Sequence, residues 1–350
     1  MILYLVSSTG TQRMGRFLKS WAPGWKKRIV VVPYSKLRRL MPLPKGTVIF
    51  ADIDSLEGEE LELAAGLYKE LASERPPRMI LNEPKRTLTR FDLLEKLHHE
   101  GINSFAVRRL VAATETRFPA FLRSEKGHRG TMTPRLRNED ELEAAIAHLK
   151  RVRLENVLVV EFEDTSDDSG MFRKYSAFRI GQEIVPVHLV FSRYWMQKRP
   201  DLLDPSKVEE EHRYLRDNPH RVQLLRLFQA AGAEYGRIDY GVGATGIQTW
   251  EIDTNPVIIL EPWQYSPGRR PNARRYAQAL MRAFEEIDDE PPPRAFLWRW
   301  KRNLVCAGSQ APLIVRTRSK LILLRGVRRI GRLPGHVGRR MRSAPGAARS

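Results

Sequence analysis

The sequence predicts a protein of mixed α/β and α+β class, with an N-terminal α/β domain, a second part of helices and paired strands, and a basic C-terminal tail. Short apolar runs alternate with helical stretches over the first eighty residues, glycine-joined strand pairs follow, and charge is uneven along the chain. A chain of 350 residues can bury sizeable cores without disulfides. The lone cysteine, Cys306, favours a reducing cytoplasm and disfavours a zinc site.

The first part of the chain predicts strands that alternate with helix. The predicted strands are 2–6, 28–32, 48–50 and 78–81. A helix is predicted over 55–72, and this alternation favours a parallel sheet. We therefore expect residues 1–86 to form one α/β domain. The apolar start is too short to span a bilayer and lacks the basic residues of a signal peptide, so it is interpreted as the first strand.

A second unit, residues 87–290, is predicted to begin with an amphipathic helix over 87–100, closed by Gly101. Within it, residues 118–165 form a subdomain with a strand at each end and, between them, a helix capped by Asn138. The remaining predicted strands are 172–180, 183–190, 235–240 and 247–252, the first two joined as a hairpin by Gly181-Gln182. The remaining predicted helices are 208–216, 221–231 and 273–287, the last one ending before three prolines at 291–293.

The most informative stretch is 236–256, where two strands are joined by a glycine-rich turn. Pairing these strands brings Asp239 beside Glu251 and Asp253, and the last two face the same side because they are two residues apart. Converging carboxylates are costly unless a cation neutralises them, and oxygen ligands suit Mg²⁺ held between carboxylates and phosphates. The alternative is a solvated polar face of an edge hairpin.

The same turn contains a G-x-G-x-x-G pattern, from Gly241 to Gly246, after a strand. A dinucleotide-binding fingerprint needs a helix next, to place its N-terminus against the pyrophosphate. The residues that follow are strand-like, so these glycines are interpreted as turn residues. NAD binding is disfavoured.

Arg237-Ile-Asp239 followed by 250–256, Trp-Glu-Ile-Asp-Thr-Asn-Pro, resembles the metal-binding signature of the ATP-grasp superfamily, which includes D-alanyl-D-alanine ligase and glutathione synthetase. The resemblance implies an N-terminal pre-ATP-grasp domain, a two-subdomain ATP-grasp fold, and ATP and Mg²⁺ as cofactors. It implies Asp239, Glu251 and Asp253 as metal ligands, although the family pattern has Asn where Asp253 stands. It also places Arg237 against the transferring phosphate, as a catalytic residue.

Other segments follow in the order that the family requires, across about 87–287. Arg123 and the glycine loop with Gly127 and Gly130 resemble the strand and loop that close over the triphosphate. The alternative is an ordinary basic surface turn. The strand around Glu161 and Phe162 resembles the segment that meets adenine and ribose. On the next strand Lys174 faces one side, Arg173 and Arg179 face the other, and only one set can face the cleft; we choose Lys174 as the phosphate contact.

Most of the net charge of +19 lies in the tail, 291–350, which holds 15 Arg or Lys residues and no acidic residue. The first 290 residues hold 45 basic and 41 acidic residues, so the body is nearly neutral. Apolar residues interleave with arginines in the tail, which fits a largely disordered extension with weak affinity for an anionic membrane surface or nucleic acid.

The expected function is ligation, in which ATP phosphorylates a carboxylate and an amine or similar nucleophile attacks the acyl phosphate. The substrates are thus a small-molecule or peptide carboxylate and a nucleophile. Two alternatives remain open: a non-catalytic nucleotide-binding scaffold that acts through its basic tail, and kinase-like transfer to a hydroxyl. Fold and ATP site do not define the substrate pocket.

Overall fold

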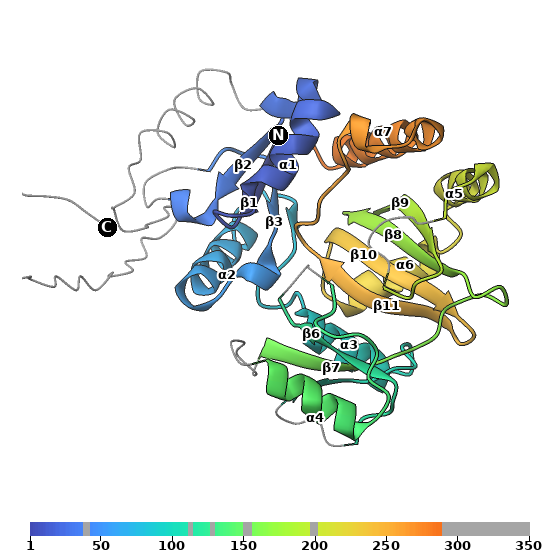
Figure 1. The fold of residues 1–350 in the computed structure, drawn as a ribbon. Helices are drawn as coiled ribbons and strands as arrows, with labels where there is room; N and C mark the ends of the chain where they lie inside the picture. Colours follow the sequence, from blue (N-terminus) through green and yellow to red (C-terminus); the bar gives the residue numbers. More distant parts are fainter. Residues whose placement is uncertain (38–42, 111–114, 127–129, 150–155, 197–201, 289–350) are drawn as a thin grey trace, which may run out of the picture.

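The computed structural model describes residues 1–37, 43–110, 115–126, 130–149, 156–196 and 202–288. Over these residues the strands form three sheets, with the orders β2-β1-β3-β4, β5-β7-β6 and β11-β10-β8-β9. Figure 1 shows the four-stranded sheets beside one another, with the three-stranded sheet below them. The basic tail lies outside the described residues. None of the helices in the described ranges is long and apolar enough to cross a bilayer.

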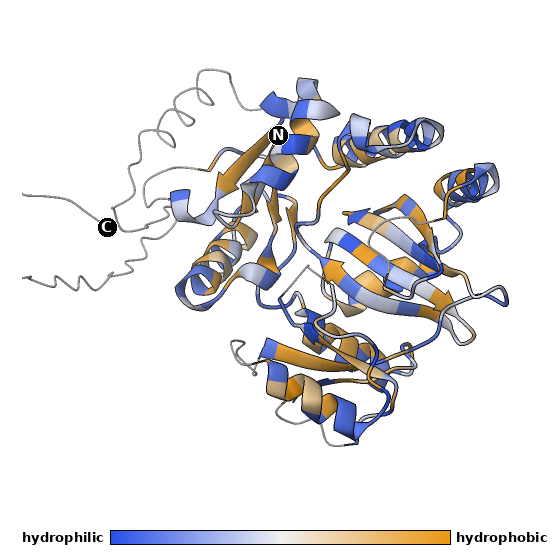
Figure 2. Ribbon diagram, viewed as in Figure 1, coloured by the Kyte–Doolittle hydropathy of each residue, from blue (hydrophilic) through white to orange (hydrophobic). Residues whose placement is uncertain are grey.

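The first sheet is parallel, as the alternation of apolar runs predicted. Its strands are β1 (Ile2–Val6), β2 (Ile29–Pro33), β3 (Thr47–Phe50) and β4 (Ile80–Leu81). Figure 2 shows these strands hydrophobic along their length, as expected of strands covered on both faces. Helix α2 (Gly58–Ala72) confirms the predicted helix. Helix α1 (Thr11–Ser20) had no counterpart among the named predictions, although its buried residues Met14, Phe17 and Leu18 have helical spacing.

The three-stranded sheet combines β5 (Val107–Arg109), β6 (Ala120–Ser124) and β7 (Val157–Glu161) in antiparallel pairs. Helix α4 (Glu139–His148) packs on it, and the predicted cap is confirmed: the Asn138 side chain accepts a hydrogen bond from the Glu141 amide at 3.0 Å. Leu142 of α4 joins Leu122 and Val159 in its core. The lid-like part predicted over 118–165 thus has a small core of its own.

The third sheet is antiparallel and is called the large sheet below. Its strands are β8 (Phe172–Ile180), β9 (Glu183–Ser192), β10 (Tyr235–Gly243) and β11 (Gly246–Asp253). The predicted hairpins are confirmed. The G-x-G-x-x-G pattern spans the β10–β11 connection: Gly241 lies within β10, and Gly243 and Gly246, the latter at a φ of 111°, pair on either side of the turn. Its strands alternate between hydrophobic and polar residues in Figure 2.

Helices cover both faces of the large sheet. They are α3 (Arg90–His99), α5 (Pro205–Asp217), α6 (Arg221–Ala230) and α7 (Arg270–Glu286). On one face, α3 and α6 pack against Ile238 and Tyr240. On the other, α7 and the first sheet share one core that includes Tyr4, Phe178 and Tyr235. The domain boundary at residue 86 stays a prediction.

Two polar side chains fix the first sheet against the large sheet. Asn82 follows β4 and donates through Nδ2 to the carbonyls of Phe50 (2.9 Å) and Tyr235 (2.8 Å). Asn255 follows β11, and its Oδ1 accepts from the Tyr4 hydroxyl at 2.8 Å. A Cβ on Gly10 would overlap the side chain of Asn255, so glycine is needed at this contact. The carboxyl ends of β1 and β3 therefore meet the end of β11.

Candidate active site

A cavity of about 380 Å³ is lined by strands of both antiparallel sheets and by Arg13 of α1. The lining includes every described residue that the sequence predicted for the site. These are Arg123, Gly130, Glu161, Phe162, Lys174, Arg237, Asp239, Glu251 and Asp253. Gly127, the remaining prediction, lies outside the described residues. Residues far apart in the sequence thus reach one cavity, whose lining contains a cluster of charged side chains and a cluster of aromatic side chains.

Asp239 on β10 is held by three side chains. Its oxygens accept from Arg237 Nε at 3.0 Å, Lys174 Nζ at 3.1 Å and Ser176 Oγ at 2.7 Å. Burial opposes the ionisation of Asp239, but the charges of Arg237 and Lys174 outweigh it and hold the pKa of Asp239 well below its usual range. Burial also opposes the charge on Arg237, and Asp239 reverses that effect, so the pKa of Arg237 lies above its usual value.

Glu251 on β11 stands directly opposite Asp239 in the register of the hairpin. Its carboxylate binds two arginines, Arg90 of α3 and Arg123 of β6, the latter at 3.1 Å. Burial and the neighbouring Arg90 lower the pKa of Arg123 to about 10, so Arg123 stays protonated at neutral pH. The Arg123 Nε is buried and has no hydrogen-bond partner among the described residues. A donor left in this way suits an anionic ligand.

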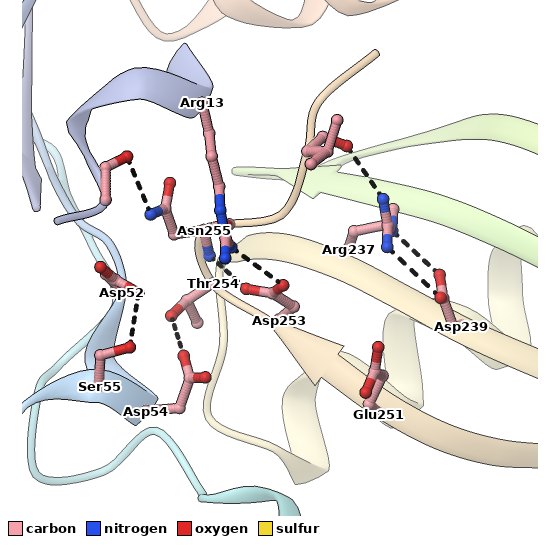
Figure 3. A network of polar contacts seen from close by, with 12 residues as sticks. Arg13, Asp52, Asp54, Ser55, Arg237, Asp239, Glu251, Asp253, Thr254 and Asn255 are labelled. Carbon is pink, nitrogen blue, oxygen red and sulfur yellow. Dashed lines mark hydrogen bonds and ion pairs between the residues drawn. The ribbon is translucent and has the colours of Figure 1, made fainter. Parts of the chain in front are cut away.

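Asp253 belongs to a different group, so the three predicted metal ligands do not converge. Its carboxylate accepts from the Asn255 amide at 2.7 Å and from Arg13 at 3.4 Å, and Arg13 also donates to the Asn255 carbonyl. Figure 3 shows Asp253 turned toward Arg13, whereas Asp239 and Glu251 lie farther along the hairpin. In the described ranges no three Asp, Glu, His or Cys side chains are placed to hold a metal ion together. The contact with α1, at the strand end, explains this difference.

Asp239 and Glu251 alone still fit a magnesium–nucleotide complex. They are paired across two neighbouring strands, they line the same cavity, and both offer only oxygen ligands. Mg²⁺ is commonly bound by one or two carboxylates while substrate phosphates and waters supply the other ligands. The surrounding cations outnumber the carboxylates, which suits a polyphosphate. They are Arg13, Arg90, Arg123, Lys174 and Arg237.

The basic residues of β8 divide between the two faces, as their alternation predicted. Lys174 faces the cavity and Asp239. Arg173 pairs with Glu210 of α5 and with Asp167, each at 2.6 Å. Arg179 is buried and donates to the Ala233 carbonyl at 2.8 Å. Of the three, only Lys174 lines the cavity.

Another part of the cavity lining consists of apolar and aromatic side chains. Trp195, which follows β9, lies 4.9 Å from the ring of Phe121 and 5.6 Å from that of Phe162. Val160, Leu94 and other apolar residues complete this wall. Such a wall suits a flat heteroaromatic group, because aromatic rings stack favourably on one another.

Glu161, predicted as the ribose contact, is instead tied into the protein. Its carboxylate accepts from the Ala106 amide at 3.0 Å, from Arg108 at 2.9 Å and from the Arg117 amide at 3.1 Å. Burial opposes its ionisation, but these donors outweigh that effect and lower the pKa of Glu161. Glu163, two residues on, lines the same cavity and makes one ion pair, with Arg117 at 3.3 Å. Glu163 is therefore better placed to meet a ligand.

Several residues that line the cavity or contact its carboxylates had no counterpart among the predicted site residues. Arg13 lies on the unpredicted helix α1, and Arg90 begins α3; neither belongs to a motif. Glu163 lies in the same short segment as the predicted Glu161, so the sequence did contain a signal for it. Ser176 has an ordinary place in a strand, and its contact with Asp239 depends on strand register.

Comparison with known proteins finds similarity at the level of structure. No family model and no curated protein matches the sequence. The structure is similar to D-alanine–D-alanine ligase from Bacillus anthracis complexed with ATP, with 13% identity, a TM-score of 0.45, and coverage of 86% of this chain and 99% of that one. It is similar to an ATP-grasp RimK domain protein from Sphaerobacter thermophilus, with 16% identity, a TM-score of 0.41, and coverage of 80% and 100%. It is also similar to carboxyaminoimidazole ribonucleotide synthase from Aspergillus clavatus complexed with ATP, with 15% identity, a TM-score of 0.42, and coverage of 72% and 69%. These similarities are distant, and the assignment of function depends on the cavity.

Proposed function

We propose that the protein is a ligase of the ATP-grasp type, which uses ATP and Mg²⁺ to activate a carboxylate for attack by an amine or similar nucleophile. One observation carries the proposal. The lining of a single cavity contains two opposed carboxylates among cations and, as a separate cluster, the aromatic wall of Phe121, Phe162 and Trp195. That division matches the two ends of a nucleoside triphosphate, because the triphosphate needs cations and the base needs a flat apolar surface.

Different residues of the cavity would bind different parts of the nucleotide. Phe121, Phe162 and Trp195 would hold the adenine, and Glu163 would accept hydrogen bonds from the ribose hydroxyls. Arg123 and Lys174 would bind the phosphates. Asp239 and Glu251 would hold Mg²⁺, which when bound screens the charge of the phosphates. We assign Asp253 to the substrate end of the cavity, beside Arg13, in place of the third metal position.

The chemistry is positioning and screening of charge. In the first step a carboxylate oxygen of the substrate forms a bond to the γ-phosphorus, the bond to the bridging oxygen breaks, and ADP leaves. In the second step the nucleophile forms a bond to the acyl carbon, phosphate leaves, and the nucleophile loses a proton. Arg237 would stabilise negative charge in both steps, because its guanidinium lines the cavity and donates to Asp239 and to the Val257 carbonyl.

The test is ADP and phosphate release with Mg²⁺ and ATP across pools of carboxylates and amines. We expect release that requires a carboxylate and that Asp239→Asn abolishes. Tight ATP binding without release in any pool would favour the alternative of a nucleotide-binding scaffold. Release with a hydroxyl acceptor and no carboxylate would favour kinase-like transfer. The proposal also includes a cytoplasmic location. It further includes binding of residues 291–350 to an anionic membrane surface or nucleic acid, which liposome and RNA binding assays of the protein without these residues would test.

A further inference from the structure

Four polar residues form one row straight across the large sheet. Strand register pairs His188 of β9 with Ser176 of β8, Ser176 with Asp239 of β10, and Asp239 with Glu251 of β11. Paired residues on neighbouring strands point to the same face, so these side chains follow one another from the outer strand β9 to β11. The row, called the polar row below, ends at the two carboxylates proposed to hold Mg²⁺.

Hydrogen bonds connect the first three members. Ser176 Oγ donates to Asp239 Oδ1 at 2.7 Å, and His188 Nε2 lies 3.0 Å from the same Oγ. A hydroxyl has one proton, and an ionised carboxylate can only accept, so the serine proton points at Asp239. His188 must then donate its Nε2 proton to the serine oxygen. Burial, with Lys174 and Arg237 nearby, lowers the pKa of His188 well below its usual value, so the ring is neutral and carries one proton.

The bulges of the sheet lie beside this row. The register shifts between Ser176 and Ala177 where β8 meets β9, and between Asp239 and Tyr240 where β10 meets β11. Each shift inserts one extra residue on the partner strand, Val187 and Trp250 respectively, and so changes the direction of the side chains on either side. Bulges are frequent next to active sites, where they aim side chains. Here they set which residues of β9 and β11 stand opposite Ser176 and Asp239.

The partners of Asp239 differ in how readily their side chains could move away from its carboxylate. Ser176 is fully buried, and its position is fixed by the backbone of a central strand. Arg237 and Lys174 are long side chains that line the cavity and keep 15% and 17% of their surface exposed. An arriving metal and triphosphate would draw these two cations from Asp239 to the phosphates. The serine bond would remain.

We infer that Ser176 and His188 are positioning residues that hold Asp239 in the orientation needed for metal binding, whereas Arg237 and Lys174 are exchangeable partners that occupy Asp239 until the nucleotide arrives. This inference rests on the proposed function. In it, His188 orients the serine hydroxyl and takes no part in the chemistry. Hydrogen-bonded groups that orient a metal ligand typically contribute tenfold or more to metal affinity.

The test is the dissociation constant of Mn²⁺ from the complex of the protein with AMP-PNP, measured by electron paramagnetic resonance. Ser176→Ala should raise this constant about tenfold. His188→Leu should raise it about threefold, since the serine keeps its bond to Asp239 but loses its orientation. His188→Gln should restore the wild-type constant, because its Nε2 can donate to Ser176. The matched control is Thr249→Val, which removes another buried hydroxyl of the same sheet, one that neither lines the cavity nor has a hydrogen-bond partner among the described residues, and should leave the constant unchanged.

The outcomes separate this inference from the proposed function. Wild-type protein that binds Mn²⁺ with AMP-PNP, together with an unchanged constant in folded Ser176→Ala or, should that variant misfold, in His188→Leu, would overturn the inference alone. Wild-type protein that binds no Mn²⁺ would overturn both. A metal-free readout is the ¹⁵N spectrum of the histidines, in which the signal lost in His188→Leu identifies His188. We expect a proton on Nε2 at pH 7; the neutral Nδ1–H tautomer, which cannot donate to Ser176, would contradict the bonding described.

Discussion

Two buried arginine–carboxylate pairs lie close to the large sheet and have opposite surroundings. Arg269, just before α7, donates to Glu211 of α5 at 2.9 Å, and Asn272 donates to the same carboxylate at 3.0 Å, so the partners of this pair are parts of the scaffold. Arg237 donates to Asp239 at 3.0 Å, but both side chains line the cavity. The first pair joins α5 to the segment before α7, whereas the second lies at the wall of the cavity. An ion pair therefore marks a site only when a cavity reaches it.

The largest expected effect follows from removing the charge of Glu251. Glu251→Gln should lower turnover by about 1000-fold, roughly 4 kcal/mol in the barrier, because a proposed metal ligand loses its charge. The fold should survive, since the amide still accepts from Arg90 and Arg123. Matched Glu210→Gln, which alters the pair with Arg173 outside the cavity, should keep turnover within about twofold. Equal losses in the two variants would contradict the comparison.

Breaking the pair of Arg269 and Glu211, called the scaffold pair, should lower stability and leave turnover unchanged. Arg269→Met leaves Glu211 buried without its cation and should lower the free energy of unfolding by about 3–5 kcal/mol. Urea unfolding measures this change, and turnover per folded molecule should stay near wild type. Arg237→Met should do the reverse, with a large loss of turnover and a smaller loss of stability. A catalytic loss in folded Arg269→Met would show that the two pairs are not distinct in role.

The same contrast applies to the two neighbouring glutamates. Glu163→Gln should raise the KM for ATP about tenfold, roughly 1.4 kcal/mol, through weaker bonds to the ribose, with kcat little changed. Glu161→Gln should instead destabilise the three-stranded sheet, because its carboxylate holds the Ala106 and Arg117 amides. Steady-state kinetics and thermal unfolding of both variants check this. A KM for ATP that changes only in Glu161→Gln would instead support Glu161 as the ribose contact, the assignment made from the sequence.

The smallest expected effect is at the substrate end. Arg13→Ala should raise the KM for the carboxylate several-fold, by about 1 kcal/mol, and leave the KM for ATP unchanged. The matched variant is Arg16→Ala on the same helix, which is exposed and bonds only Gln12 among the contacts described, at 3.4 Å. It should change neither constant. A rise in the KM for ATP in Arg13→Ala would move Arg13 to the phosphate end.

Much of the fold could be predicted from the sequence because local patterns determine it. Continuous apolar runs identified the parallel strands, the Gly181-Gln182 turn identified the β8–β9 hairpin, and Asn138 capped its helix as expected. Helix α1 was not among the named elements, because its apolar positions are few among basic residues.

The site could be predicted only in part, because its details depend on contacts between distant segments. The spacing of Glu251 and Asp253 predicted a shared face, but the contact of Asp253 with Arg13, 240 residues away, depends on how the two sheets pack. The family resemblance of the segment around residue 162 implied a ribose contact at Glu161, but the Ala106 and Arg117 amides donate to that carboxylate. The polar row needs the registers of four strands and two bulges, and no local pattern encodes them.

The most direct test of the central claim is a crystal structure of the protein with AMP-PNP and Mn²⁺, in which anomalous scattering locates the metal. The account predicts Mn²⁺ bound to Asp239 and Glu251, adenine against Phe162 and Trp195, and Arg237 and Lys174 moved onto the phosphates. A nucleotide bound outside this cavity, or a metal that contacts neither Asp239 nor Glu251, would contradict it.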